Sequence, residues 1–315
     1  MPRSSSSGPL PWIRAARPGF FPIALLMYAS GVFAGARHAG ALDWLPALLG
    51  YLCVLLAQAA AGFTNEHFDH SGDAHNQNAS RFTGGSRVLV DKLLTHEDLL
   101  KASAASVVAL GAASALLLAT TPHTLRVPLT IATALGIALA LAYTAPPLKL
   151  GSRGFGELTV AFTHTTLVLL FGWTIQGGSP TAQVPFLVAM PAFWALLALR
   201  TLAGIPDVPA DRATGRRTYA VIFGPAQAAG IAAFAALAAG TAGILLWRDG
   251  ILRGLPGVLA VAAAAHGVVL AVMLARYIRS GAGVRRIGQL LGVATAFVLW
   301  YGLIPLLRFL GASFG

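Results

Sequence analysis

The chain has 315 residues, of which 56% are hydrophobic and only 10% charged, whereas soluble globular domains carry about 25% charged residues. This composition excludes a soluble domain. The formal net charge of +11 indicates basic loops on the inner side of a membrane rather than a nucleic-acid partner. The single cysteine, Cys53, excludes a disulfide framework and a cysteine-ligated metal site.

Residues 1–18 are polar, basic and rich in Pro and Ser. They lack the short apolar core and the small-residue cleavage site of a secretory signal peptide. We therefore expect a retained interfacial tail, followed by a single transmembrane domain over residues 19–315.

Long apolar runs recur along that domain. A helix needs about 20 mostly apolar residues to cross the roughly 30 Å hydrocarbon core of a bilayer. We therefore expect an all-α integral membrane protein, with about nine helices around a central cavity open to the cytoplasmic side. The predicted spans are residues 19–36, 44–64, 102–121, 127–145, 158–176, 182–199, 225–247, 254–275 and 287–307.

The basic residues are distributed unequally between the two sides of these spans. Seventeen of the 22 Lys and Arg residues fall on the side of the N-terminus, and basic loops are retained in the cytoplasm. We thus expect a multi-pass protein of the cell membrane, which is the inner membrane where there are two. Its N-terminus would lie in the cytoplasm and its C-terminus on the outer side of that membrane. Two long charged connections, residues 65–101 and 200–218, lie on the inner side, and such loops usually carry function.

Each long connection contains an acidic motif. In the first, Asn65, Asp69 and Asp73 recur every four residues, so a continuing helix would place them on one face. In the second, Asp207 and Asp211 repeat this interval. Four crossings separate the two motifs, so both are expected in the same compartment.

Gathered carboxylates need cations. At an effective dielectric constant of about 20, two like charges about 4 Å apart repel by about 4 kcal/mol. Hard oxygen donors on two sides, with positions open to phosphate oxygens, indicate a magnesium and diphosphate site rather than a closed calcium site. The alternative is a set of solvated ion pairs, which contribute little to stability. The basic residues expected to bind the remaining phosphate oxygens are Arg81, Arg87, Lys149, Arg153, Arg216 and Arg217.

With these motifs the chain resembles the UbiA-type superfamily of intramembrane prenyltransferases. The resemblance covers nearly the whole chain and includes the nine-span layout, the two acidic motifs and the segments 81–89, 143–158 and 211–224. It implies a transferase that uses Mg²⁺ to move a polyprenyl group from its diphosphate to a small aromatic acceptor in quinone biosynthesis. It also implies polyprenyl diphosphate, that acceptor and the lipid bilayer as partners.

The resemblance assigns roles residue by residue. It makes Asn65 and the four aspartates of the motifs the metal ligands, gives the aspartates a catalytic role, and adds Asn65 to the substrate-binding residues. Glu66 stands where Asp is usual, which leaves its metal role open. Tyr143, at the end of the fourth span, would place its ring against the allylic cation, or would serve as an interfacial anchor.

The acceptor is less closely defined. Segment 81–89 resembles the dihydroxynaphthoate (menaquinone) branch, which favours 1,4-dihydroxy-2-naphthoate as the acceptor. Residues 205–208, Ile-Pro-Asp-Val, look more like homogentisate-type members, so homogentisate, 4-hydroxybenzoate or another aromatic acceptor stays open.

A secondary transporter is the alternative of a different class. It would place charged groups near the bilayer midplane, where this chain has only His164 and His266. For His266 we expect a neutral ring hydrogen-bonded to a neighbouring helix. For His164 a role at the acceptor site is left open.

Overall fold

The computed structural model describes residues 8–76, 85–281 and 287–311. Nine helical segments in these ranges are long and apolar enough to cross a membrane, each lying over one of the predicted runs. The described residues form no β-strand, and the only bridge among them is an isolated one between Arg153 and Arg217. The predicted all-α membrane fold is confirmed.

The first span combines a short helix with a long one, and the fifth is built from three consecutive segments. In chain order the spans are η1 (Pro18–Phe20) with α2 (Phe21–Ala39), α3 (Trp44–Phe68), α5 (His96–Thr120), α6 (His123–Ala142), α7 (Gly156–Ala161) with η3 (Phe162–Leu167) and α8 (Val168–Ile175), α9 (Gln183–Ala203), α12 (Pro225–Arg248), α13 (Leu255–Arg279) and α14 (Ile287–Leu310). The short connecting helices are α1 (Leu10–Ala15), α4 (His70–His75), η2 (Leu150–Ser152), α10 (Val208–Ala213) and α11 (Tyr219–Phe223).

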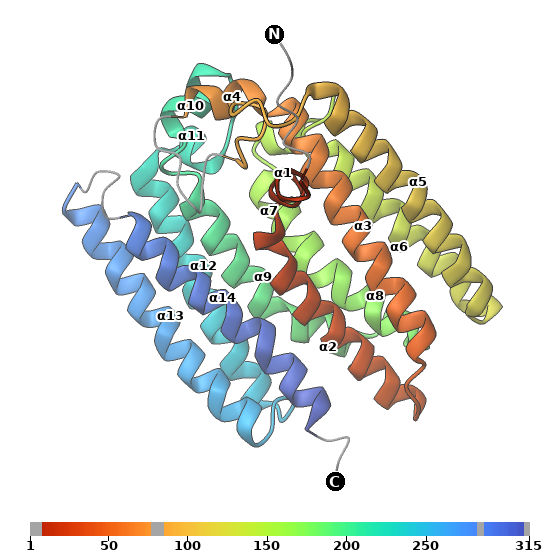
Figure 1. Ribbon diagram of the computed structural model, residues 1–315. Helices are drawn as coiled ribbons and strands as arrows, with labels where there is room; N and C mark the ends of the chain where they lie inside the picture. Colours follow the sequence, from red (N-terminus) through yellow and green to blue (C-terminus); the bar gives the residue numbers. More distant parts are fainter. Residues whose placement is uncertain (1–7, 77–84, 282–286, 312–315) are drawn as a thin grey trace.

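Both acidic motifs lie at one end of the bundle. Figure 1 shows α4, α10 and α11 side by side at the end where α1 also lies, and α14 running to the opposite end. Helix α4 contains Asp73 of the first motif and α10 contains Asp211 of the second, and the two helices are in contact. Four crossings therefore bring the motifs together, as the sequence predicts.

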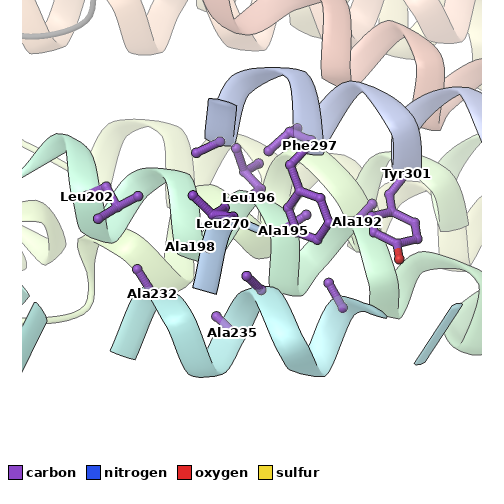
Figure 2. Close-up of a cluster of buried hydrophobic side chains, with 14 of the residues drawn as sticks. Ala192, Ala195, Leu196, Ala198, Leu202, Ala232, Ala235, Leu270, Phe297 and Tyr301 are labelled. Carbon is purple, nitrogen blue, oxygen red and sulfur yellow. The ribbon is translucent and has the colours of Figure 1, made fainter. Parts of the chain in front are cut away.

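Small residues hold one half of the bundle together. Ala192 and Ala195 of α9 face Ala232 and Ala235 of α12, and all four are buried. Figure 2 shows these alanines with larger side chains such as Phe297 from α14. Because lipid tails are as apolar as Leu, helices associate in a membrane through close van der Waals packing, which small side chains permit.

The predicted environment of His266 is confirmed. Its Nε2 lies 3.1 Å from the carbonyl oxygen of Val293, and Trp300 Nε1 lies 3.2 Å from its Nδ1. The carbonyl can only accept and the indole can only donate, so Nε2 carries the hydrogen. The ring joins α13 to α14 with both nitrogens engaged.

Candidate active site

The first acidic motif keeps its helical spacing where α3 ends and α4 begins. The backbone N–H of Asp69 donates to the carbonyl of Asn65 at 2.8 Å, and that of Asp73 to the carbonyl of Asp69 at 3.0 Å. The three side chains therefore follow one another at four-residue steps on one side of the chain. Asn65 is oriented by Thr144, whose hydroxyl donates to Asn65 Oδ1 at 2.8 Å.

The second motif repeats this arrangement at the start of α10. The N–H of Asp211 donates to the carbonyl of Asp207 at 2.8 Å. Asp207 Oδ1 accepts a hydrogen bond of 2.7 Å from the side chain of Asn76, which follows the first motif. Thr218 donates to Asp211 Oδ2 at 3.1 Å, so both aspartates are held in place by neutral donors.

Arg216 connects the two motifs. Its Nη1 lies 3.1 Å from Asp69 Oδ2, and its Nε lies 3.9 Å from Asp211 Oδ1. The same Nε donates to the carbonyl of Gly151 at 3.3 Å. Burial lowers the pKa of this guanidinium, but Asp69, Tyr143 and Asp211 together raise it above its ordinary value, so Arg216 stays positively charged.

A second arginine enters the site from the N-terminal segment. Arg17 Nε donates to Glu66 Oε1 at 2.7 Å, and Arg17 Nη2 lies 3.8 Å from Asp73 Oδ2. The buried Glu66 also accepts from the backbone N–H of Ser86 at 3.0 Å. Glu66 thus pairs with an arginine and anchors a loop, and it does not line the polar cavity described below.

The loop after the first motif approaches Asp73 closely. Gly85 has φ +69°, and a Cβ at this position would overlap the carboxylate of Asp73, so only glycine fits. Arg87 donates from Nη1 to the main-chain carbonyl of Asp73 at 3.2 Å. This predicted phosphate ligand therefore contacts the first motif through its backbone.

The charged side chains surround one polar cavity. Its lining includes five acids and four arginines, namely Asp69, Asp73, Glu157, Asp207, Asp211, Arg14, Arg17, Arg200 and Arg216. Burial, opposed by Arg17 and reinforced by the carboxylates of Glu66 and Asp69, raises the pKa of Asp73 to about 7. Burial, opposed by Arg216 and reinforced by Asp207, raises the pKa of Asp211 to about 6. The arginines therefore do not fully compensate the carboxylates.

Unpaired polar atoms in this cavity test whether a metal and diphosphate would fit. Glu157 Oε2, Arg17 Nη2 and Arg200 Nε are buried and have no hydrogen-bond partner in the described part of the chain. A carboxylate oxygen without a donor suits a cation, whereas free guanidinium N–H groups suit anionic oxygens. A divalent cation bound with a diphosphate would satisfy both kinds of group.

The spacing of the donors is also informative. Among the described residues, no three Asp, Glu, His or Cys side chains lie close enough together to hold an ion unaided. Mg²⁺ is usually bound through one or two carboxylates, with waters and substrate phosphates as its other ligands. The donors of this cavity fit that mode of binding and do not fit an all-protein cage.

An apolar cavity adjoins the polar one. Its described lining is mostly apolar and comes from the first six spans and from the residues just before the first of them. Four residues line both cavities: Arg17, Phe20, Tyr143 and Arg200. A ligand with a charged head and a hydrocarbon body could therefore occupy both cavities at once.

Most of the predicted site residues line one of the two cavities, and the others do not. Asp69, Asp73, Asp207, Asp211, Tyr143 and Arg216 line the polar cavity, and Asn65 lines the apolar one. Lys149, Arg153 and Arg217 have exposed side chains outside both linings. Arg81 lies outside the described residues.

Arg17 and Glu157 are not among the site residues predicted from the sequence. Arg17 was placed in the interfacial tail, and its partner Glu66 lies 49 positions away. Glu157 is the second residue of α7 and accepts the backbone N–H of Tyr219 through Oε1 at 2.9 Å. The Arg17–Glu66 and Tyr219–Glu157 contacts each join segments that are distant in the sequence, so no local pattern predicts them. The only sequence signal for Glu157 is its place in the family-like segment 143–158.

The fold and this site define an integral membrane protein with a charged cavity above a hydrocarbon-lined one. The profile described as the UbiA prenyltransferase family matches residues 24–299. The chain therefore belongs to this family and is a prenyltransferase.

Relatives and solved structures agree with this assignment. The chain is 30% identical over 220 residues to a protein of Corynebacterium glutamicum named lycopene elongase/hydratase, covering 70% of this chain and 68% of that one. A structure of digeranylgeranylglyceryl phosphate synthase has a TM-score of 0.66 at 14% identity, covering 96% of this chain and 98% of the other. A UbiA homolog from Archaeoglobus fulgidus bound to DMAPP and Mg²⁺ has a TM-score of 0.64 at 17% identity, covering 93% and 98%.

The contacts of Glu66 predict a large effect on stability. Glu66→Gln removes the charge that pairs with Arg17, whose side chain is 21% exposed, and leaving a largely buried hydrogen-bonding group without its partner costs about 1–3 kcal/mol. We expect the free energy of unfolding to fall by roughly this amount, measured in detergent solution. A double-mutant cycle with Arg17→Met should show a coupling energy above about 1 kcal/mol.

The control for this cycle is the Glu97–Lys101 pair, whose side chains are 75% and 74% exposed. Glu97→Gln should change the free energy of unfolding by less than about 0.5 kcal/mol. Equal effects of the two Glu→Gln substitutions would contradict the assigned role of Glu66.

Proposed function

We propose that this prenyltransferase binds an allylic prenyl diphosphate with Mg²⁺ in the polar cavity and transfers its prenyl group to an electron-rich acceptor in the apolar cavity. The observation that carries the proposal is the convergence of both acidic motifs and Arg216 on a cavity that adjoins a hydrocarbon-lined one. The A. fulgidus homolog bound to DMAPP and Mg²⁺ supports the same pairing of ligands.

The motif aspartates and two of the arginines in the polar cavity then have a role. Asp69, Asp73, Asp207 and Asp211 would hold Mg²⁺, with Asn65 as a further oxygen donor beside them. When bound, Mg²⁺ supplies positive charge that stabilises the diphosphate leaving group. Arg17 and Arg216 are proposed to bind phosphate oxygens, because guanidinium groups suit phosphate geometry. Arg87, Lys149, Arg153 and Arg217, which lie outside the polar lining, could contact phosphate only after a rearrangement.

Transfer begins when the allylic carbon–oxygen bond breaks and its electron pair leaves with the diphosphate. Tyr143 lines both cavities, which supports a role in which its ring faces the allylic cation. The apolar lining excludes water, which would otherwise capture the cation. A π bond of the acceptor then supplies the electron pair for the new carbon–carbon bond.

The acceptor that we propose first is 1,4-dihydroxy-2-naphthoate. Arg200 supports an acceptor of this kind, because its buried Nε has no partner among the described residues and its side chain lines the apolar cavity. A carboxylate on an aromatic ring would satisfy this guanidinium.

A polyene hydrocarbon is the second candidate acceptor. The relative named lycopene elongase/hydratase favours it, and the described lining of the apolar cavity contains no Asp or Glu. Homogentisate and 4-hydroxybenzoate are retained as further aromatic alternatives.

A purified enzyme assay separates these acceptors. With Mg²⁺ and a labelled allylic diphosphate, the enzyme should prenylate dihydroxynaphthoate at a higher kcat/KM than lycopene, homogentisate or hydroxybenzoate. Arg200→Met should lower kcat/KM for the carboxylated acceptors and leave that for lycopene nearly unchanged. If lycopene were the only acceptor prenylated, the acceptor would be a polyene hydrocarbon and not dihydroxynaphthoate.

The two motifs should be equally indispensable. Asp69→Ala and Asp207→Ala are each expected to lower kcat by at least about 100-fold, because each removes charge that stabilises the leaving group. Asp249→Ala is the matched control, since Asp249 is 52% exposed at the end of α12 and should keep full turnover. A chelator should abolish turnover, and full activity in either Asp→Ala variant would refute the assigned roles.

The site is also proposed to face the cytoplasm of a cell whose inner membrane holds this multi-pass protein. The excess of basic residues on the side of the N-terminus supports this orientation. An impermeant maleimide added to intact cells should label Asp249→Cys and leave Lys101→Cys unlabelled until the cells are opened. Labelling of Lys101→Cys but not of Asp249→Cys in intact cells would show that the site faces the outside instead.

A further inference from the structure

His164 lies in the apolar cavity without a role in the chemistry above. It belongs to η3, the π-helical part of the fifth span, and single π-helical turns are frequent at functional sites. Its ring centroid is 5.8 Å from that of Phe20, and Arg200 lies 5.3 Å from the same Phe20 ring. The imidazole is therefore next to the residues that line both cavities.

The contacts of Nδ1 determine which ring nitrogen carries the hydrogen. Nδ1 lies 3.1 Å from the carbonyl oxygen of Val160 and 3.0 Å from the hydroxyl of Thr163. The carbonyl can only accept. The single hydroxyl hydrogen of Thr163 is donated to the carbonyl of Thr159 at 2.8 Å, so Thr163 also accepts. Nδ1 therefore carries the hydrogen and shares it between two acceptors.

Nε2 of His164 consequently keeps a free lone pair. No described residue forms a hydrogen bond with it, and no Asp or Glu in the described lining of the apolar cavity would stabilise a charged ring. His266, which also lies in the middle of a span, differs because both of its nitrogens are hydrogen-bonded. His164 thus presents a neutral base where the acceptor is proposed to bind.

We propose that His164 is the catalytic base that accepts the proton lost by the acceptor, an inference that rests on the proposed prenyl transfer. The prenyl carbon–oxygen bond breaks with its electron pair on the diphosphate, and an acceptor π pair forms the carbon–carbon bond. An O–H or C–H bond of the acceptor then breaks. Its electron pair restores a neutral acceptor, and its proton goes to Nε2 of His164.

Substitution and chemical rescue test this role. His164→Gln should lower kcat about 100-fold, within the range for loss of a general base, with an unchanged KM for the prenyl diphosphate. In His164→Gly, added imidazole should restore turnover at least tenfold. Thiazole has nearly the same shape and is a far weaker base, so it should restore none. His266→Gln is the matched control and should keep kcat within about twofold.

The outcomes are distinct. Full turnover in His164→Gln, or equal rescue by thiazole and imidazole, would show that His164 is not the catalytic base. Neither result would contradict prenyl transfer by the wild-type enzyme. A wild-type enzyme that releases diphosphate and prenylates no acceptor would instead overturn the proposed function and the base together.

Discussion

The guanidinium of Arg216 is the contact on which the site depends, because it connects carboxylates of two distant segments. Asp69, with which it pairs, lies 147 positions away in sequence, and Asp211 belongs to the other motif. Four carboxylates from the two motifs share one lining with Glu157 and four arginines, and burial raises the pKa of Asp73 and Asp211. Arg216 only partly relieves the repulsion among these carboxylates, and the proposed metal and diphosphate would relieve it further.

The two cavities divide the chemistry between a charged and an apolar environment. Water-excluded charge can stabilise a leaving group strongly, while a hydrocarbon lining protects a cation from water. Phe20, Tyr143 and Arg200 lie where the environments meet, which is where the reacting carbon of a bound prenyl diphosphate would lie. The described parts of α12, α13 and α14 line neither cavity; α12 and α14 pack against α9, which lines both cavities, and α13 packs against α12 and α14.

Local patterns in the sequence predicted the spans and the spacing within each motif. Hydropathy over about 20 residues and the four-residue helical step depend only on neighbours in the chain, so α3 and α4 keep Asn65, Asp69 and Asp73 in step. Contacts between distant segments are not encoded in this way. Arg17 enters the site at a turn in which its own backbone has φ 54°. Lys149 and Arg153, which were predicted to bind phosphate, remain outside the polar lining.

The central claim is that the two motifs bind one ligand together. Its most direct test is a double-mutant cycle of Asp69→Asn and Asp211→Asn, in which calorimetry measures the affinity for an unreactive allylic thiolodiphosphate with Mg²⁺. If both residues bind one ligand, the loss of binding free energy in the double variant should differ from the sum of the two single losses by more than about 1 kcal/mol. Additive losses of affinity, or a loss in one variant only, would contradict a shared site.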